Sequence, residues 1–111
     1  MAEETVRTIV NGTFEISTEY QPRFMALLTP HLIEQMKEGC VYYSLAIDTV
    51  KTDVLRLIEG WRDQKALDDH LASDSVKAIQ KRMAEIPIRN YQMVIYTVTS
   101  QTDYAMSATS S

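Results

Sequence analysis

The fold is decided by two short stretches of the sequence, Glu38-Gly39-Cys40-Val41-Tyr42-Tyr43 and Glu59-Gly60-Trp61-Arg62-Asp63. Gly39 is the kind of residue that takes the left-handed conformation at the end of a helix. Strand-forming residues follow it at once, so a strand is predicted to begin at Cys40. A second strand is predicted to end at Trp61, and Asp63 is a good N-cap for a helix that carries His70.

The remaining elements extend this pattern in both directions along the chain. Strands are predicted at 6–16, 40–48, 54–61 and 91–99, a long helix at 21–37, and two shorter helices between 63 and Pro87. The resulting β-α-β-β-α-β order predicts the ferredoxin-like arrangement of the α+β class. Residues 1–99 are expected to form one domain, and the polar residues 100–111 a flexible tail.

The composition excludes several classes of protein. The chain has 111 residues, is 45% hydrophobic and carries a net charge of −4, with no cluster of Lys and Arg. Nucleic acid is therefore not an expected partner. No apolar run approaches the ~20 residues that cross a membrane, and residues 1–4 do not begin a signal peptide. Cys40 is the single cysteine, so neither a disulfide nor a metal site is expected, and a cytoplasmic location is predicted.

The strands predict a homodimer. Apolar residues occupy both faces of 54–61 and of 91–99, whereas one layer of helices covers a single face of such a sheet. A second copy of the same sheet is the simplest cover for the other face. We therefore expect two chains to pack sheet against sheet.

The two decisive stretches also resemble a known family. The chain is similar to the antibiotic biosynthesis monooxygenases at ten positions: Glu38, Gly39, Cys40, Tyr43, Glu59, Trp61, Asp63, Ala66, Leu67 and His70. The resemblance extends from about Val6 to Thr99 and implies a dimeric α+β barrel. It also implies oxidation of a small aromatic or polycyclic phenol or quinol by dioxygen, without a bound cofactor.

Two residues are candidates for catalysis. His70 is predicted to face inward beside Ala66 and Leu67, where its imidazole could take a proton from a phenolic substrate. Alternatively, His70 forms a hydrogen bond that fixes its helix to the sheet. Asn11 lies in the middle of a strand, where asparagine is disfavoured. It could hold a substrate carbonyl or dioxygen, or it could be a bulge residue next to Gly12.

A pocket is predicted between the sheet and the helices, with His70 and Trp61 on its wall. The candidate substrate-binding residues are Trp61, Tyr43, Phe24, Leu28, His31 and Leu67. For Trp61, Tyr43 and His31 the alternative is ordinary packing in the core. Glu59 is expected to pair with Arg62, with Arg89 or with backbone donors, because an unpaired buried carboxylate is costly.

Three functions compete at this point. The first is the cofactor-independent monooxygenase, and the second is a dimeric barrel that binds a small hydrophobic molecule without turnover. The third is a haem-degrading enzyme of the same superfamily, for which Asn11 fits, while His70 and Gln80 stand where other residues are expected. Oxygen uptake with a quinol substrate distinguishes the first function from the second.

Overall fold

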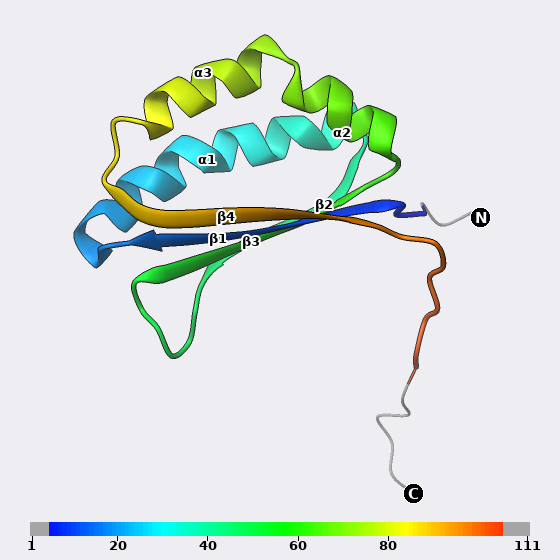
Figure 1. Ribbon diagram of the computed structural model, residues 1–111, viewed down its shortest axis with the longest axis horizontal. Coiled ribbons are helices and arrows are strands. Elements are labelled where there is room, and N and C mark those ends of the chain that lie inside the picture. Colours follow the sequence, from blue (N-terminus) through cyan, green and yellow to red (C-terminus); the bar gives the residue numbers. More distant parts are fainter. Residues whose placement is uncertain (1–4, 106–111) are drawn as a thin grey trace, which may run out of the picture.

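The computed structural model describes residues 5–105, and these form an antiparallel sheet with helices on one face (Figure 1). The order of elements confirms the predicted ferredoxin-like α+β fold, with the second helical segment divided into α2 and α3. Short 3-10 turns precede and follow α1. The main elements are β1 (Thr8–Ile16), α1 (Gln21–Gln35), β2 (Cys40–Ile47), β3 (Val54–Trp61), α2 (Gln64–Leu71), α3 (Asp74–Met83) and β4 (Ile88–Thr97).

The strands lie in the order β2-β3-β1-β4. β1 is therefore internal, and its residue Thr8 lies opposite Trp61 on one side and Thr97 on the other. β2 and β4 form the two edges of the sheet. β4 begins at Ile88, three residues before the predicted start, because Ile88 pairs with Ile16 next to an irregularity in the ladder.

The predicted boundary residues have the expected conformations. Gly39 has a φ of 104° and ends the 3-10 turn that follows α1, so β2 starts at Cys40. Asp63 caps α2 by accepting a hydrogen bond of 2.8 Å from the backbone N–H of Ala66. Ser73 caps α3 in the same way through Val76. These short polar and glycine signals fix where the helices meet the sheet.

Two clusters of buried residues fill the space between the helices and the sheet. The apolar cluster consists of Phe14, Ile16, Phe24, Leu28, Leu32, Leu55, Leu57 and Ile86. At the opposite end of the same layer, hydrophobic residues are joined by buried polar side chains. We call this the mixed cluster: Val10, Cys40, Trp61, Ala66 and Leu67, with Gln35, Glu59 and His70.

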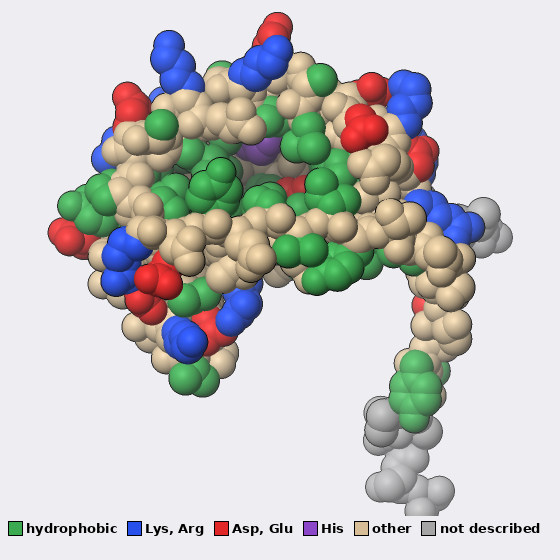
Figure 2. Space-filling view, viewed as in Figure 1, with side chains coloured by type: hydrophobic (Ala, Val, Ile, Leu, Met, Phe, Trp, Pro, Cys, Tyr) green, Lys and Arg blue, Asp and Glu red, His purple; other side chains and the backbone are tan. Residues whose placement is uncertain are grey.

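No helix of residues 5–105 lies over the second face of the sheet (Figure 1). Because side chains alternate along a strand, residues between the core positions point to this open face. Tyr42, Ile58 and Tyr96 lie there and are 39%, 37% and 49% exposed. Figure 2 shows hydrophobic side chains on this side of the sheet. The open face is therefore partly apolar, as the sequence predicted.

The predicted tail begins beyond β4. Residues 98–105 form neither helix nor strand, and the remainder of the predicted tail, 106–111, lies outside the described residues. Within the described part of the chain, no helix is long and apolar enough to cross a membrane.

Candidate functional site

An inner pocket of about 650 Å³ lies between the helices and the sheet. Figure 2 shows the hollow, with a histidine side chain at its back. Its volume is in the range of pockets that hold small organic ligands. The lining residues are Phe14, Leu28, His31, Leu32, Leu57, Glu59, His70, Val76, Ile79, Gln80, Met83, Ala84, Ile86, Ile88, Tyr91 and Met93.

The edge strand β4 supplies an aromatic and a thioether to the floor of this pocket. Tyr91 stacks on Phe14 with the ring centroids 6.1 Å apart. Gly12 leaves room for Met93, because a Cβ atom at Gly12 would lie 2.7 Å from the sulfur of Met93. Tyr91 and Met93 were not among the predicted binding residues. A signal for them is present in the sequence, because residues 91, 93 and 95 alternate along β4 and so share the face that meets the helices. The helices leave Tyr91, Met93 and Ile95 partly exposed on this face.

His70 is the most constrained polar group of the pocket. Its side chain is 4% exposed, and Nδ1 lies 3.2 Å from Oε2 of Glu38. An ionised carboxylate only accepts hydrogen bonds, so this contact places the Nδ1 proton on His70. In the neutral imidazole, Nε2 is then left with a free lone pair. The ring is held between Trp61 and His31, at centroid distances of 4.8 Å and 5.0 Å.

Glu59 is a second buried polar group in the pocket wall. It is 7% exposed, and its Oε1 accepts a hydrogen bond of 2.9 Å from the indole Nε1–H of Trp61. The prediction that Glu59 pairs with Arg62 or Arg89 is wrong. Arg62 contacts Asp63, and Arg89 contacts Asp53 and Glu15. Trp61 is the partner because residues two apart on a strand lie on the same face.

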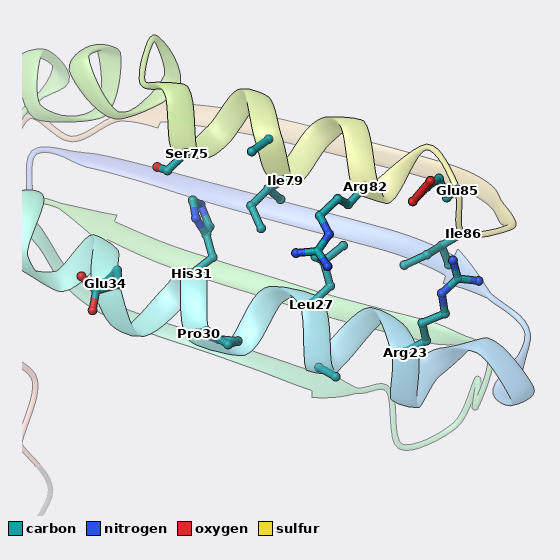
Figure 3. Close-up of a pocket in the computed structure, with 12 residues that line it drawn as sticks. Arg23, Leu27, Pro30, His31, Glu34, Ser75, Ile79, Arg82, Glu85 and Ile86 are labelled. Carbon is teal, nitrogen blue, oxygen red and sulfur yellow. The ribbon is translucent and has the colours of Figure 1, made fainter.

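His31 lies at a boundary between two cavities. It lines the inner pocket and also an outer groove of about 590 Å³ between α1 and α3. Figure 3 shows His31 and Leu27 projecting from α1, and Ile79 and Arg82 from α3, into this groove. Burial, followed by the nearby His70, lowers the pKa of His31 below 6.5. A neutral imidazole is therefore favoured at this boundary.

A family comparison identifies the type of protein that carries this pocket. The family model described as antibiotic biosynthesis monooxygenase matches residues 7–82. The chain belongs to this family. The family resemblance of the sequence is thereby confirmed. All members of the mixed cluster lie within the matched segment.

Solved structures show the same fold. A protein of Deinococcus radiodurans superimposes with a TM-score of 0.81 at 20% identity, over 89% of this chain and 99% of that one. A conserved protein from Methanosarcina mazei Go1 gives 0.72 at 27% identity, over 85% and 94%. Rv0793 from Mycobacterium tuberculosis gives 0.75 at 22% identity, over 86% and 98%. No curated protein matches the chain.

The predicted substrate-binding residues of this family member divide into three groups. Leu28 and His31 line the inner pocket. Phe24, Leu67 and Trp61 are at most 1% exposed and lie in the clusters behind its wall. Tyr43 is partly buried and packs against both clusters. The wall therefore contains His70 but not Trp61, which supports it from behind as a core residue.

Asn11 does not share a cavity with His70. On β1, Asn11 lies opposite Ile58 and Val94 and points to the open face, whereas its neighbour Val10 is buried under the helices. The strand carries apolar residues on both faces, so the sequence could not decide between them. The structure thus separates the two candidate catalytic residues. It also removes from the pocket the residue on which the haem-degrading alternative depended.

Cys40 is poorly suited to be a nucleophile. It is buried, and this burial raises the pKa of its thiol to about 11. Because the thiolate is the reactive form, the side chain acts as a small core residue. Among residues 5–105, no three His, Cys, Asp or Glu side chains are grouped as ligands for a metal ion.

Proposed function

We propose that this protein is a cofactor-independent monooxygenase that oxidises a small aromatic phenol or hydroquinone with dioxygen. The observation that carries the proposal is the environment of His70. It is a buried imidazole in an apolar pocket, and Glu38 holds its Nδ1 proton. Membership of the antibiotic biosynthesis monooxygenase family supports the same class of reaction.

In the proposed reaction, His70 Nε2 accepts the proton of an aromatic hydroxyl. Glu38 stabilises the imidazolium that forms, as a carboxylate does for a catalytic histidine in general. The side chain of Glu38 is 39% exposed, so it connects the buried ring to water. The proton can leave the pocket by this path.

The electrons come from the substrate. The electron-rich phenolate reacts with dioxygen inside an apolar cavity that keeps water from the intermediates. For a hydroquinone, one oxygen atom enters the ring and the other leaves as water, so that the product is a hydroxyquinone. The substrate supplies all the electrons, and no external reductant is consumed.

Naphthohydroquinone is a suitable test substrate. Oxygen uptake and product mass are measured with isotopically labelled dioxygen, against the uncatalysed oxidation. We expect faster uptake and a product that contains one labelled oxygen atom. Uptake no faster than without protein, despite binding of the substrate, would instead support a binding protein without turnover.

The role of His70 is tested on the same assay. His70→Ala should lower the turnover rate by about 100-fold or more, and added imidazole should restore part of it. Lys65→Ala is the matched control, since Lys65 lies on the exposed side of the same helix. If His70 only anchors α2, the variant loses about 1–3 kcal/mol of stability, with little change in rate per folded molecule.

We also propose that the protein is a homodimer that buries the open face of the sheet. Ile58 and Tyr96 give this face exposed apolar surface, and removing such surface from water is favourable. Ile58→Glu should therefore produce a monomer in sedimentation at micromolar concentration. Ile33→Glu is the matched control, because Ile33 is 52% exposed on α1, away from the sheet. A wild-type monomer at that concentration would contradict the proposal.

A further inference from the structure

Glu59 is a buried carboxylate for which the proposed proton transfer has no role. It is 7% exposed, lies in β3 two residues before Trp61, and lines the inner pocket. A buried carboxylate is costly unless hydrogen bonds replace its lost water. Any hydrogen-bonding capacity that the protein leaves unused at Glu59 therefore indicates a site for a ligand.

The hydrogen bonds of Glu59 are incomplete. Oε1 accepts from the indole N–H of Trp61. Among residues 5–105, this is the hydrogen bond found for the Glu59 side chain, and Oε2 accepts none. A carboxylate has room for about four donors, so most of its accepting capacity is unused. Because Glu59 lines the pocket, a ligand in the pocket is the available source of donors.

Trp61 keeps the carboxylate in place. Its ring is fully buried, and it contacts both Glu59, through the indole N–H, and His70, at a centroid distance of 4.8 Å. The two polar groups of the pocket wall are therefore held by one rigid side chain. Because Glu59 and His70 both line the inner pocket, we expect an aromatic ligand beside His70 to reach Glu59 as well.

We propose that Glu59 recognises a hydroxyl group of the aromatic ligand and so selects its reduced form. An ionised carboxylate accepts hydrogen bonds but cannot donate them. The hydroxyl of a hydroquinone donates to it, and such charge-assisted bonds are short and strong. The carbonyl oxygen of the corresponding quinone offers only lone pairs, so it is repelled. The substrate is held, and the oxidised product is released.

This inference rests on the proposed function for its class of ligand, but its test does not require turnover. Binding is measured by calorimetry without oxygen, with dimethylnaphthohydroquinone and dimethylnaphthoquinone as probes. Methyl groups at both free positions of the quinone ring prevent addition of protein nucleophiles. We expect wild-type protein to bind the hydroquinone about tenfold or more tightly than the quinone, as for a hydrogen bond to a charged group.

Glu59→Gln is the decisive variant. Its amide oxygen can still accept from Trp61, while its NH₂ group can donate to a quinone carbonyl. The preference for the hydroquinone should therefore fall to near one or reverse. Glu34→Gln is the matched control on the exposed surface of α1, and it should keep the wild-type preference.

Three results would overturn the inference. They are equal binding of both probes by the wild type, a preserved preference in Glu59→Gln, or equal loss of preference in Glu34→Gln. If Glu59→Gln does not fold, the test uses wild-type protein alone. Its binding of naphthohydroquinone is compared with its binding of dimethoxynaphthalene, which has no hydrogen-bond donor. This ether should bind about tenfold or more weakly than naphthohydroquinone, and equal binding would refute the role of Glu59. Preference without oxygen uptake would leave this inference intact and refute the monooxygenase.

Discussion

The apolar cluster and the mixed cluster occupy two ends of one layer, yet they are built differently. In the apolar cluster, Phe14 and Phe24 pack with ring centroids 4.9 Å apart, and the buried polar side chain next to it, Gln21, is satisfied by donating to the backbone oxygens of Ile16 and Thr52. The mixed cluster contains buried Gln35, Glu59 and His70. Among the described residues, Oε1 of Gln35 has no hydrogen-bond partner at all. One end of the layer stabilises the fold, and the other accepts a cost in stability.

In the proposed function, this cost has a chemical use. Buried polar groups interact more strongly than the same groups in water, because less solvent screens them. Trp61 and Leu67 exclude water from behind Glu59 and His70. The mixed cluster therefore places oriented polar groups in the wall of the inner pocket, whereas residues of the apolar cluster form much of its apolar lining. Variants at each end should separate these two contributions.

The largest effect is expected in the apolar cluster. Phe24 is fully buried, so Phe24→Ala removes a large side chain and leaves a cavity. The free energy of unfolding should fall by about 3–5 kcal/mol, measured by urea denaturation. Tyr104→Ala is the control, since Tyr104 is 85% exposed and should change stability by less than about 0.5 kcal/mol. A small effect at Phe24 would contradict the role of the apolar cluster in stabilising the fold.

Gly39→Ala should have the next largest effect, at the border of the mixed cluster. Gly39 has a φ of 104°, and an added Cβ atom would lie 2.9 Å from that of Ala66. Backbone strain and overlap together should cost about 2–4 kcal/mol in the same denaturation experiment. The change should also shift Glu38, so binding in the inner pocket should weaken in the folded variant. Unchanged stability would show that the turn tolerates a side chain.

The hydrogen bond between Trp61 and Glu59 should contribute less. Trp61→Phe removes the indole N–H, and Glu59→Met removes the acceptor. A double-mutant cycle on these positions should give a coupling free energy of about 1–3 kcal/mol, as for a buried hydrogen bond to a charged group. Additive effects of the two changes would show that the contact of 2.9 Å is energetically neutral.

The smallest effect is a pH dependence from His31. Its folded-state pKa lies below 6.5 because of burial and of His70, with Glu59 and Glu38 acting in the opposite direction. The unfolded chain therefore binds this proton more readily, so stability is full above pH 6.5 and falls as the pH drops through the folded-state value. His31→Gln should reduce the difference in urea midpoint between about pH 7.5 and about pH 5.5. An unchanged difference would assign it to other groups.

The two clusters also differ in how well the sequence predicted them. Local signals such as Gly39 and Asp63 placed the ends of the helices, and the spacing of Phe24 and Leu28 identified a buried helix face. These features depend on neighbours in the sequence. The predicted fold class and family were confirmed for that reason.

The polar site was harder to predict, because its contacts join distant residues. Glu38 and His70 are 32 positions apart, so their hydrogen bond became visible only in the folded chain. The face of Asn11 was ambiguous because both faces of β1 carry apolar residues. The partner of Glu59 is only two residues away, but the indole N–H of Trp61 is uncharged, so the sequence favours an arginine as the partner instead.

The central place of β1 has a consequence for the order in which the chain folds. Both strands that pair with β1 come later in the sequence, and Thr8 must meet Thr97 before β4 is in register. Contacts between such distant residues form slowly, because closing a long loop costs entropy. The hairpin of β2 and β3 is local and can form early. Tyr91 and Met93 belong to β4, so we expect the inner pocket to be completed only when this last strand pairs with β1.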